Sequence, residues 1–522
     1  MSETIAIADR NKLLLGLGFA TGMEFYIADS MNLVLPDIAG TLGVGTDEAS
    51  WLLTTYSSAM FLGVPVCIWL AGHVGYKRYL VGTVALFALA SLGCALSPSF
   101  PALLTCRAVQ GFAGAGLVVW WRASIYLLMA KPLRSPSLMR VSTMLYLASA
   151  SGLLASGWIT ENLDSHLIFV PILGLAVLAT WFLWRYFPDV PRPVSHRLAH
   201  TDVIGILLLG VAVVSLQVIL SRGPVDDWMG SAHLRALAWV TVLSLGMFIA
   251  WQGSHLNKAP LLDMALVRDR SVLSSVLLGV FAGVILSGSL YALPEYLRNI
   301  DPRRLSAFQT AQVMCVYAFV GALIRPAMVE LIARIGQRKA IMLALLRLIA
   351  SMLWFARVLT SGTPNSAYVV PLILYACCVV PLLPALGSGT VARIDQGRLL
   401  DGVSLYMTFR QFGASLGVAG LNALIDWRET YHSSRLFEHV RGNHPLTDGV
   451  LRDLGATATE RAGVTSVEGH RMAMGMLRDL ASTQSATLAY ADAFLAMALI
   501  GCMTILLLPV VPPTPAAKKL FA

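Results

Sequence analysis

The sequence is short of charged residues. They make up 13% of the 522 residues, whereas a typical soluble domain carries roughly 25%. Hydrophobic residues make up 57%, and apolar stretches of about 20 residues recur along the chain, each long enough to cross a hydrocarbon core of about 30 Å as a helix. The composition therefore excludes an ordinary soluble protein and predicts an all-α polytopic membrane protein.

Residues that build disulfides and metal sites are also scarce where they would be needed. All seven cysteines fall in apolar stretches, where a small buried side chain is the simplest interpretation. All ten histidines fall in loops or at the edges of such stretches. We predict no disulfide, no metal site and no cofactor, and we expect carboxylates to handle any proton.

Fourteen stretches are candidates for membrane-spanning helices. The first follows two basic residues, as a signal peptide does, but Glu24 interrupts it and no clear small-residue cleavage site follows, so we interpret it as a span. The predicted spans are about 13 to 38, 50 to 72, 79 to 97, 101 to 127, 141 to 160, 166 to 187, 202 to 221, 234 to 254, 271 to 294, 307 to 332, 340 to 360, 367 to 391, 402 to 425 and 489 to 511.

Positive charge gathers in alternate loops, which predicts that these loops and both termini lie in the cytoplasm. The intervening loops carry acids such as Asp226 and Asp227, with "RNIDPRR" at 298 to 304 as an exception. The net charge of +9 then matches the anionic inner leaflet and gives no reason to expect nucleic-acid binding.

Two stretches of the sequence share the same pattern of a glycine followed by basic residues. "LAGHVGYKR" at 70 to 78 and "LIARIGQRK" at 331 to 339 start half a chain apart. An ordinary cytoplasmic hairpin would explain either one, but the pair indicates an internal repeat, as in transporters whose two bundles rock about a central site. We therefore predict two six-helix bundles, 1 to 190 and 266 to 522, joined by two extra helices in 191 to 265. The expected gating residues are Gly75, Lys77, Arg78, Gly336, Arg338 and Lys339.

Further motifs carry a resemblance to a known family. "RAVQGFAGAG" at 107 to 116 places Arg107, Gln110 and Gly111 in the order of the fourth-helix signature of the major facilitator superfamily. "SLQVILSRGPVDDWM" at 215 to 229 and "FRQFGASLG" at 409 to 417 resemble its fourteen-helix drug/proton antiporter branch, of the EmrB and QacA type and closer to EmrB. The resemblance covers nearly the whole chain.

This resemblance implies a proton-driven exporter of small organic compounds in a bacterial inner membrane. It also implies that the segment 426 to 488, which corresponds to a large periplasmic loop, faces a periplasmic adaptor that leads to an outer-membrane channel. A simple cap over the outer mouth is the alternative. The spacing of apolar and charged residues in the segment 426 to 488 is compatible with helices and predicts short ones there.

The fifth-helix antiporter signature is altered here. Where the family has a glycine-proline pair followed by two glycines, the chain reads "GLLASG" at 152 to 157, so Leu153 replaces the proline and Ser156 one glycine. A facilitator or importer of an organic anion with the same fold therefore remains as an alternative. A membrane-embedded enzyme is less well supported, because no catalytic constellation lies at one membrane depth.

Charged residues within spans are costly and indicate function. Glu24 and Asp29 lie about 140° apart on the first helix and face different neighbours, whereas Asn32 shares a face with Asp29. The family's acid lies two positions before Asp29, where Ile27 stands. We expect an acid that exchanges protons, with Arg107 controlling its charge; the alternative is a fixed ion pair of either acid with Arg107 or Arg410.

The other expected site residues line a cavity or pack helices. Arg122 follows Trp120 and Trp121 on the helix of Arg107, which predicts an anionic or zwitterionic aromatic substrate. Small residues allow helices to approach closely where they slide or rock. The expected cavity residues are Asn32, Gln110, Trp120, Trp121, Arg122 and Arg410, and the expected packing glycines are Gly111, Gly152, Gly157, Gly413 and Gly417.

Overall fold

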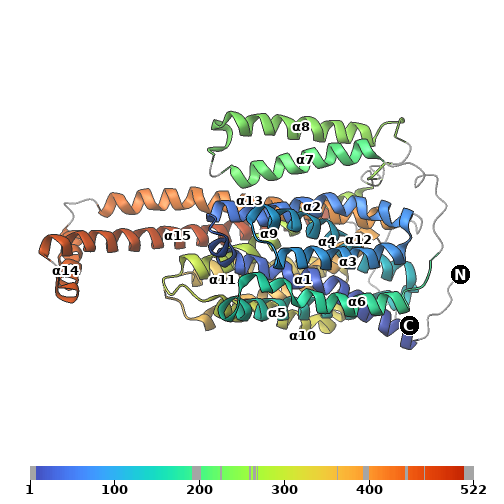
Figure 1. Cartoon of the computed structure of the whole chain (residues 1–522), viewed down its shortest axis with the longest axis horizontal. Coiled ribbons are helices and arrows are strands. Elements are labelled where there is room, and N and C mark those ends of the chain that lie inside the picture. Colours follow the sequence, from blue (N-terminus) through green and yellow to red (C-terminus); the bar gives the residue numbers. More distant parts are fainter. Residues whose placement is uncertain are drawn as a thin grey trace.

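The computed structural model describes residues 7–190, 202–223, 226–257, 260–262, 266, 269–360, 362–391, 399–440, 445–463 and 465–510. Within these ranges the long elements are all helices (Figure 1). The first six long helices are α1 (Ile7–Leu42), α2 (Thr46–Val74), α3 (Tyr76–Ala95), α4 (Phe100–Leu128), α5 (Lys131–Asn162) and α6 (Pro171–Tyr186). The remaining helices are α7 (Val203–Arg222), α8 (Ala232–Gln252), α9 (Arg270–Glu295), α10 (Ala307–Ile335), α11 (Gln337–Val358), α12 (Val369–Val391), α13 (Leu399–Val440), α14 (Pro445–Ala462) and α15 (Ser466–Leu507).

Helices α1 to α13 and α15 correspond to the fourteen predicted spans. Twelve of the described helices are long and apolar enough to cross a membrane, and α1 and α13 are not among them. The physical reason is their polar content, because α1 carries Glu24 and Asp29 and α13 carries Arg410. Both helices pack against others on several sides, α1 on α5 and α6 and α13 on α9 and α15, which keeps their polar groups away from lipid.

The helices form two groups with an extra pair alongside. In the first group α2 packs on α4 and α1 on α5; in the second α9 packs on α13 and α11 on α12. The groups meet where α5 lies against α10 and α2 against α13. Helices α7 and α8 pack on each other as a separate layer, seen in green in Figure 1. Leu209 and Val213 of α7 attach this layer through an apolar cluster that includes Phe61 of α2 and Leu405 of α13.

The two repeated turns have the same geometry. Gly75 ends α2 and also begins α3, with φ 98°, and Gly336 ends α10 and begins α11, with φ 82°. The amide of Gly75 donates to the Ala71 carbonyl over 2.9 Å, and the amide of Gly336 donates to the Ile332 carbonyl over 3.0 Å. Glycine is required at both places, because a side chain disfavours this left-handed region. The sequence repeat is thus a repeat of backbone structure.

Helices α13 and α15 project beyond the bundle, with α14 at their tip (Figure 1). We call this end of the molecule the hairpin end. The sequence predicted short separate helices between 426 and 488, but most of that segment continues the two spans instead. Residues 421 to 440 contain no glycine or proline to stop α13, and α15 starts early because Thr465 and Glu468 form a capping box at its first turn.

Candidate functional site

Asp29 lies at a junction of three helices. Its carboxylate oxygen Oδ2 accepts hydrogen bonds from the hydroxyls of Ser149 on α5 and Tyr317 on α10. The two hydroxyl oxygens are themselves 3.1 Å apart. Because α1 and α5 belong to the first helix group and α10 to the second, this carboxylate joins the two groups. Asn32 lies partly buried one turn further along α1.

Glu24 has different neighbours, as the spacing on α1 predicted. It is buried, with 6% of its surface exposed. A Cβ atom placed on Gly114 of α4 would lie 2.9 Å from the hydroxyl oxygen of Tyr56 and 3.6 Å from Cγ of Glu24. The absence of a side chain at Gly114 therefore lets Tyr56 of α2 and Glu24 of α1 meet against α4.

Arg107 is almost fully buried, with 1% exposed. Its Nη1 donates to Oε1 of Gln110 over 2.6 Å, and its Nε donates to the Leu52 carbonyl over 3.4 Å. The guanidinium also lies over the Tyr56 ring, 4.2 Å from its centre. Gln110 in turn donates to Ser91 of α3 over 2.8 Å. Within the described residues Arg107 therefore contacts neutral groups, and no fixed ion pair with Glu24 or Asp29 is found.

The structure separates the two neighbouring tryptophans. Arg122 stacks over Trp121, 4.8 Å from the ring centre, and its Nη1 lies 3.7 Å from Sδ of Met407 on α13. Trp120 instead packs against Tyr76 on α3, with ring centres 4.9 Å apart, and is 0% exposed. Trp120 and Arg122 are two residues apart and therefore point about 160° apart on the helix, whereas Trp121 lies next to Arg122. Trp120 thus supports α4 instead of lining a cavity with Arg122.

The packing glycines lie at close helix crossings. A Cβ on Gly111 would collide with the Tyr56 carbonyl oxygen, and one on Gly152 with that of Tyr26. On α13, Gly413 and Gly417 meet the backbone of α9 in the same way. Gly157 differs, because a Cβ there would lie 2.8 Å from Cβ of Ala311 on α10, across the boundary between the helix groups.

Further polar contacts between the two groups gather toward the hairpin end. Arg298, after α9, forms an ion pair with Asp37 of α1, with Nη2 and Oδ1 3.0 Å apart. Glu161 of α5 accepts a hydrogen bond of 2.8 Å from the amide of Phe308, in the first turn of α10. These contacts hold the groups together at this end.

The sequence could not single out the residues whose hydroxyl groups lie beside Glu24 and Asp29. Tyr56, Ser149 and Tyr317 each lie in a span that contains other serines, threonines or tyrosines. Their one shared signal is a polar group at span depth.

No group of three or more histidine, cysteine, aspartate or glutamate side chains that could hold a metal occurs among the described residues. Some of the basic residues behind the prediction of cytoplasmic loops lie outside the described residues: Arg192, Arg197, Lys258, Arg268, Arg393, Arg398, Lys518 and Lys519.

Comparison with solved structures identifies the fold. The chain aligns with the human organic anion transporter TETRAN (TM-score 0.57, 14% identity, 94% of this chain and 98% of that one). It also aligns with a bacterial homologue of the lysosomal transporter Spinster in an inward-facing, unoccupied conformation (TM-score 0.58, 14% identity, 97% and 98%). At such low identity these matches concern the fold alone.

Comparison with curated proteins gives closer relatives. The fatty acid resistance protein FarB of Neisseria gonorrhoeae is 26% identical over 434 residues, which cover 82% of this chain and 83% of FarB. The multidrug export protein EmrB of Escherichia coli K12 is 25% identical over 458 residues, which cover 86% of this chain and 88% of EmrB. The predicted similarity to the EmrB type is thus confirmed. The model of the Major Facilitator Superfamily matches residues 14–418, well over half of the sequence, and the chain therefore belongs to that superfamily.

Proposed function

We propose that this protein exports small organic compounds across a bacterial inner membrane in exchange for protons, with Asp29 as the proton carrier. The observation that carries the proposal is the junction of Asp29, Ser149 and Tyr317. The names of the relatives, multidrug export for EmrB and fatty acid resistance for FarB, support export. We further propose substrates that are anionic or zwitterionic and aromatic.

The junction offers a physical route from protonation to conformation. An ionised carboxylate accepts hydrogen bonds from both hydroxyls, and such charge-assisted bonds are roughly twice as strong as neutral ones. Protonation of Asp29 removes this advantage and weakens its bond to Tyr317 across the two helix groups. Conversely, a conformation that keeps Tyr317 beside Asp29 favours the ionised form over one in which Tyr317 has moved away.

The direction of transport follows from the side of the membrane on which the charged turns lie. If the turns at Gly75 and Gly336 face the cytoplasm, as their cations suggest, the hairpin end faces the periplasm. The ion pair of Arg298 with Asp37 then closes the periplasmic side. In that state Asp29 would release its proton toward the cytoplasm, which is the direction that drives export.

Proton flux in proteoliposomes tests the proposal. We expect substrate addition to release protons from the wild-type protein, using 2-naphthoate, a zwitterionic quinolone and tetraphenylphosphonium as probes. Asp29→Asn should lower proton-coupled transport about 100-fold, in line with the loss of an essential proton-transfer group, and leave substrate binding in place. Glu24→Gln and Arg107→Ala serve as comparisons for the other buried charges.

A facilitator of organic anions is the second candidate. It is favoured by Leu153, which is fully buried where the antiporter signature has a proline. Transport that continues at the same rate without a proton gradient in the wild type and in Asp29→Asn would establish the facilitator and overturn proton exchange.

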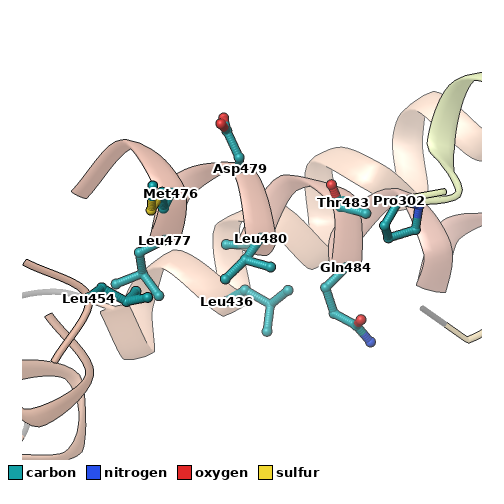
Figure 2. Close-up of a pocket in the computed structure, with 10 residues that line it drawn as sticks. Pro302, Leu436, Leu454, Met476, Leu477, Asp479, Leu480, Thr483 and Gln484 are labelled. Carbon is teal, nitrogen blue, oxygen red and sulfur yellow. The ribbon is translucent and has the colours of Figure 1, made fainter. Parts of the chain in front are cut away.

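We also propose that the hairpin end docks a periplasmic adaptor, which would connect the protein to an outer-membrane channel. A groove of about 710 Å³ lies between α13, α14 and α15, and Figure 2 shows Leu436, Leu454, Leu477 and Leu480 on its walls. Leu480 is 60% exposed and Met476, one turn earlier on α15, is 48% exposed, so this groove offers an apolar surface to a partner. Leu480→Asp should abolish co-purification with a co-expressed periplasmic adaptor of the EmrB type of pump and leave proteoliposome transport intact. Unchanged co-purification, or no co-purification with the wild type, would contradict the docking site.

A further inference from the structure

Three arginines from both helix groups face one region of the interior. Arg122 comes from α4, Arg325 from α10 and Arg410 from α13. Arg122 reaches α13 at Met407, with 3.7 Å between Nη1 and Sδ, and Arg410 follows Met407 by one helical turn. Arg122 lies within electrostatic range of both other arginines. The three guanidinium groups therefore form a cluster, which we call the arginine cluster.

Two tyrosines complete its surroundings. Tyr406 precedes Arg410 by one turn on α13 and interacts electrostatically with Arg410 and Arg122. Tyr146 of α5 packs against Gly321, one turn before Arg325 on α10: a Cβ on Gly321 would lie 2.9 Å from Cδ1 of Tyr146. Aromatic side chains thus stand beside the cations on both sides of the boundary between the helix groups.

Several hydrogen-bond donors in the arginine cluster lack acceptors. Nε of Arg325, Nε of Arg410 and the hydroxyl of Tyr406 are buried and have no hydrogen-bond partner among the described residues. Arg325 is 5% exposed, and its Nη1 donates a hydrogen bond of 3.0 Å to the Val380 carbonyl. Buried polar groups are almost always satisfied in proteins, and guanidinium groups can only donate. These donors are therefore available to an acceptor that is not part of the described protein.

The charge of the region points to the nature of that acceptor. The contacts of the arginine cluster are neutral: a carbonyl, a thioether and the Trp121 ring. Among the described residues none of the three arginines forms an ion pair, although the acid Glu24 lies within electrostatic range of Arg410. Water could satisfy the donors, but it carries no charge to offset the three cations. Charges inside a membrane protein are normally paired.

We infer that Arg122, Arg325 and Arg410 bind the acid group of an amphipathic organic anion, whose apolar body lies against Trp121, Tyr406 and Met407. A planar carboxylate matches the paired donors of a guanidinium. The inference rests on the proposed function, because this anion would be the transported compound. Since the arginines come from both helix groups, the bound anion would bridge them.

Equilibrium binding to the full-length protein in nanodiscs tests the site without any proton gradient. The probe is 2-naphthoate, compared with 2-naphthalenemethanol, which has the same ring system and no charge. We expect the wild type to prefer the acid at least tenfold, and Arg325→Gln and Arg410→Gln each to weaken naphthoate binding at least tenfold. Binding of the alcohol should change less than twofold, which also shows that the variants are folded.

Arg347→Gln is the matched control. Arg347 of α11 is partly buried and makes similar contacts, 3.4 Å to the Cys377 carbonyl on α12 and 3.8 Å to Sδ of Met328, but it does not belong to the arginine cluster. Its loss should leave naphthoate binding within twofold of wild type. Arg410→Lys, which keeps the charge but not the fork of donors, should recover part of the affinity.

Four results would overturn the inference. They are equal affinity for acid and alcohol, unaltered naphthoate binding in both cluster variants, an equal loss in Arg347→Gln, and displacement of naphthoate by phosphatidylglycerol with the same arginine dependence, which would make this a lipid headgroup site. Tight naphthoate binding without proton-coupled flux would refute only proton exchange. Proton-coupled flux of other probes without naphthoate binding would refute only the anion site.

Discussion

Two aspartates in this protein gather hydrogen bonds in different ways. Asp202, just before α7, accepts five: from the side chains of Trp251, Gln252 and Asn257 and from the amides of Gly205 and Leu261. All five donors belong to the linker helices or the segment after them. Asp29 accepts from Ser149 and Tyr317, which belong to opposite helix groups.

The difference lies in what moves with each carboxylate. Because the partners of Asp202 belong to the linker helices and the segment that follows them, its bonds persist whenever these parts move as a unit. Asp29 must lose its hydrogen bond from Tyr317 when the two helix groups separate at the level of this junction. The same chemistry therefore fixes structure in one place and reports conformation in the other, and variants of the two sites should affect different measurements.

The largest effect on stability is expected for Asp202→Ala. It would leave five donors without their acceptor, and we expect a loss of about 2 to 4 kcal/mol in the free energy of unfolding, as for a broken network around a buried charge. Thermal unfolding in detergent measures this loss. Transport per folded molecule should stay near the wild-type value; a loss of proton coupling would contradict the comparison.

The same site has a defined pH dependence. Burial raises the pKa of Asp202, but the hydrogen bonds from Trp251, Asn257, Gln252 and Gly205 outweigh it and hold the pKa below its usual value. A lowered pKa in the folded state means that the stabilisation is complete above the unfolded value of about 4 and is lost as the pH falls through the folded value. The stability difference between wild type and Asp202→Ala should thus be constant from pH 5 to 8 and shrink below pH 4.

The sequence was informative about the fold because its signals are local. Apolar length alone predicted fourteen of the fifteen long helices among the described residues, and the positions of Gly75 and Gly336 predicted two turns that share a left-handed glycine. The extension of α13 and α15 beyond the membrane was missed, because a polar helix and a loop with short helices have similar composition. Continuity is decided by the absence of a breaker between 421 and 440 and by the cap at Thr465.

The site was only partly accessible from sequence. Glu24, Asp29 and Arg107 stand out because charge is rare in a span. Their partners do not: Ser149 and Tyr317 lie 120 and 288 residues from Asp29 in the chain, and each is an ordinary span residue by type. Such pairings come from tertiary packing, which a single sequence does not encode in any local pattern.

A smaller loss of stability, together with an effect on coupling, is expected for Tyr317→Phe. The change removes the charge-assisted bond from α10 to Asp29 and keeps the ring, so the free energy of unfolding should fall by about 1.5 to 3 kcal/mol. Proton-coupled transport should fall about tenfold, and its dependence on pH should shift, because this state no longer favours the ionised carboxylate.

Tyr375→Phe is the control that sharpens this comparison. Tyr375 of α12 lies beside Tyr317, with ring centres 5.8 Å apart, and its hydroxyl donates to the Leu286 carbonyl on α9 over 3.0 Å. Donor and acceptor belong to the same helix group, so this bond should persist through the transport cycle and its loss should leave the pH profile unchanged. An equal shift in both variants would mean that Tyr317 acts through packing alone, and Asp29 would then need another partner to sense the conformation.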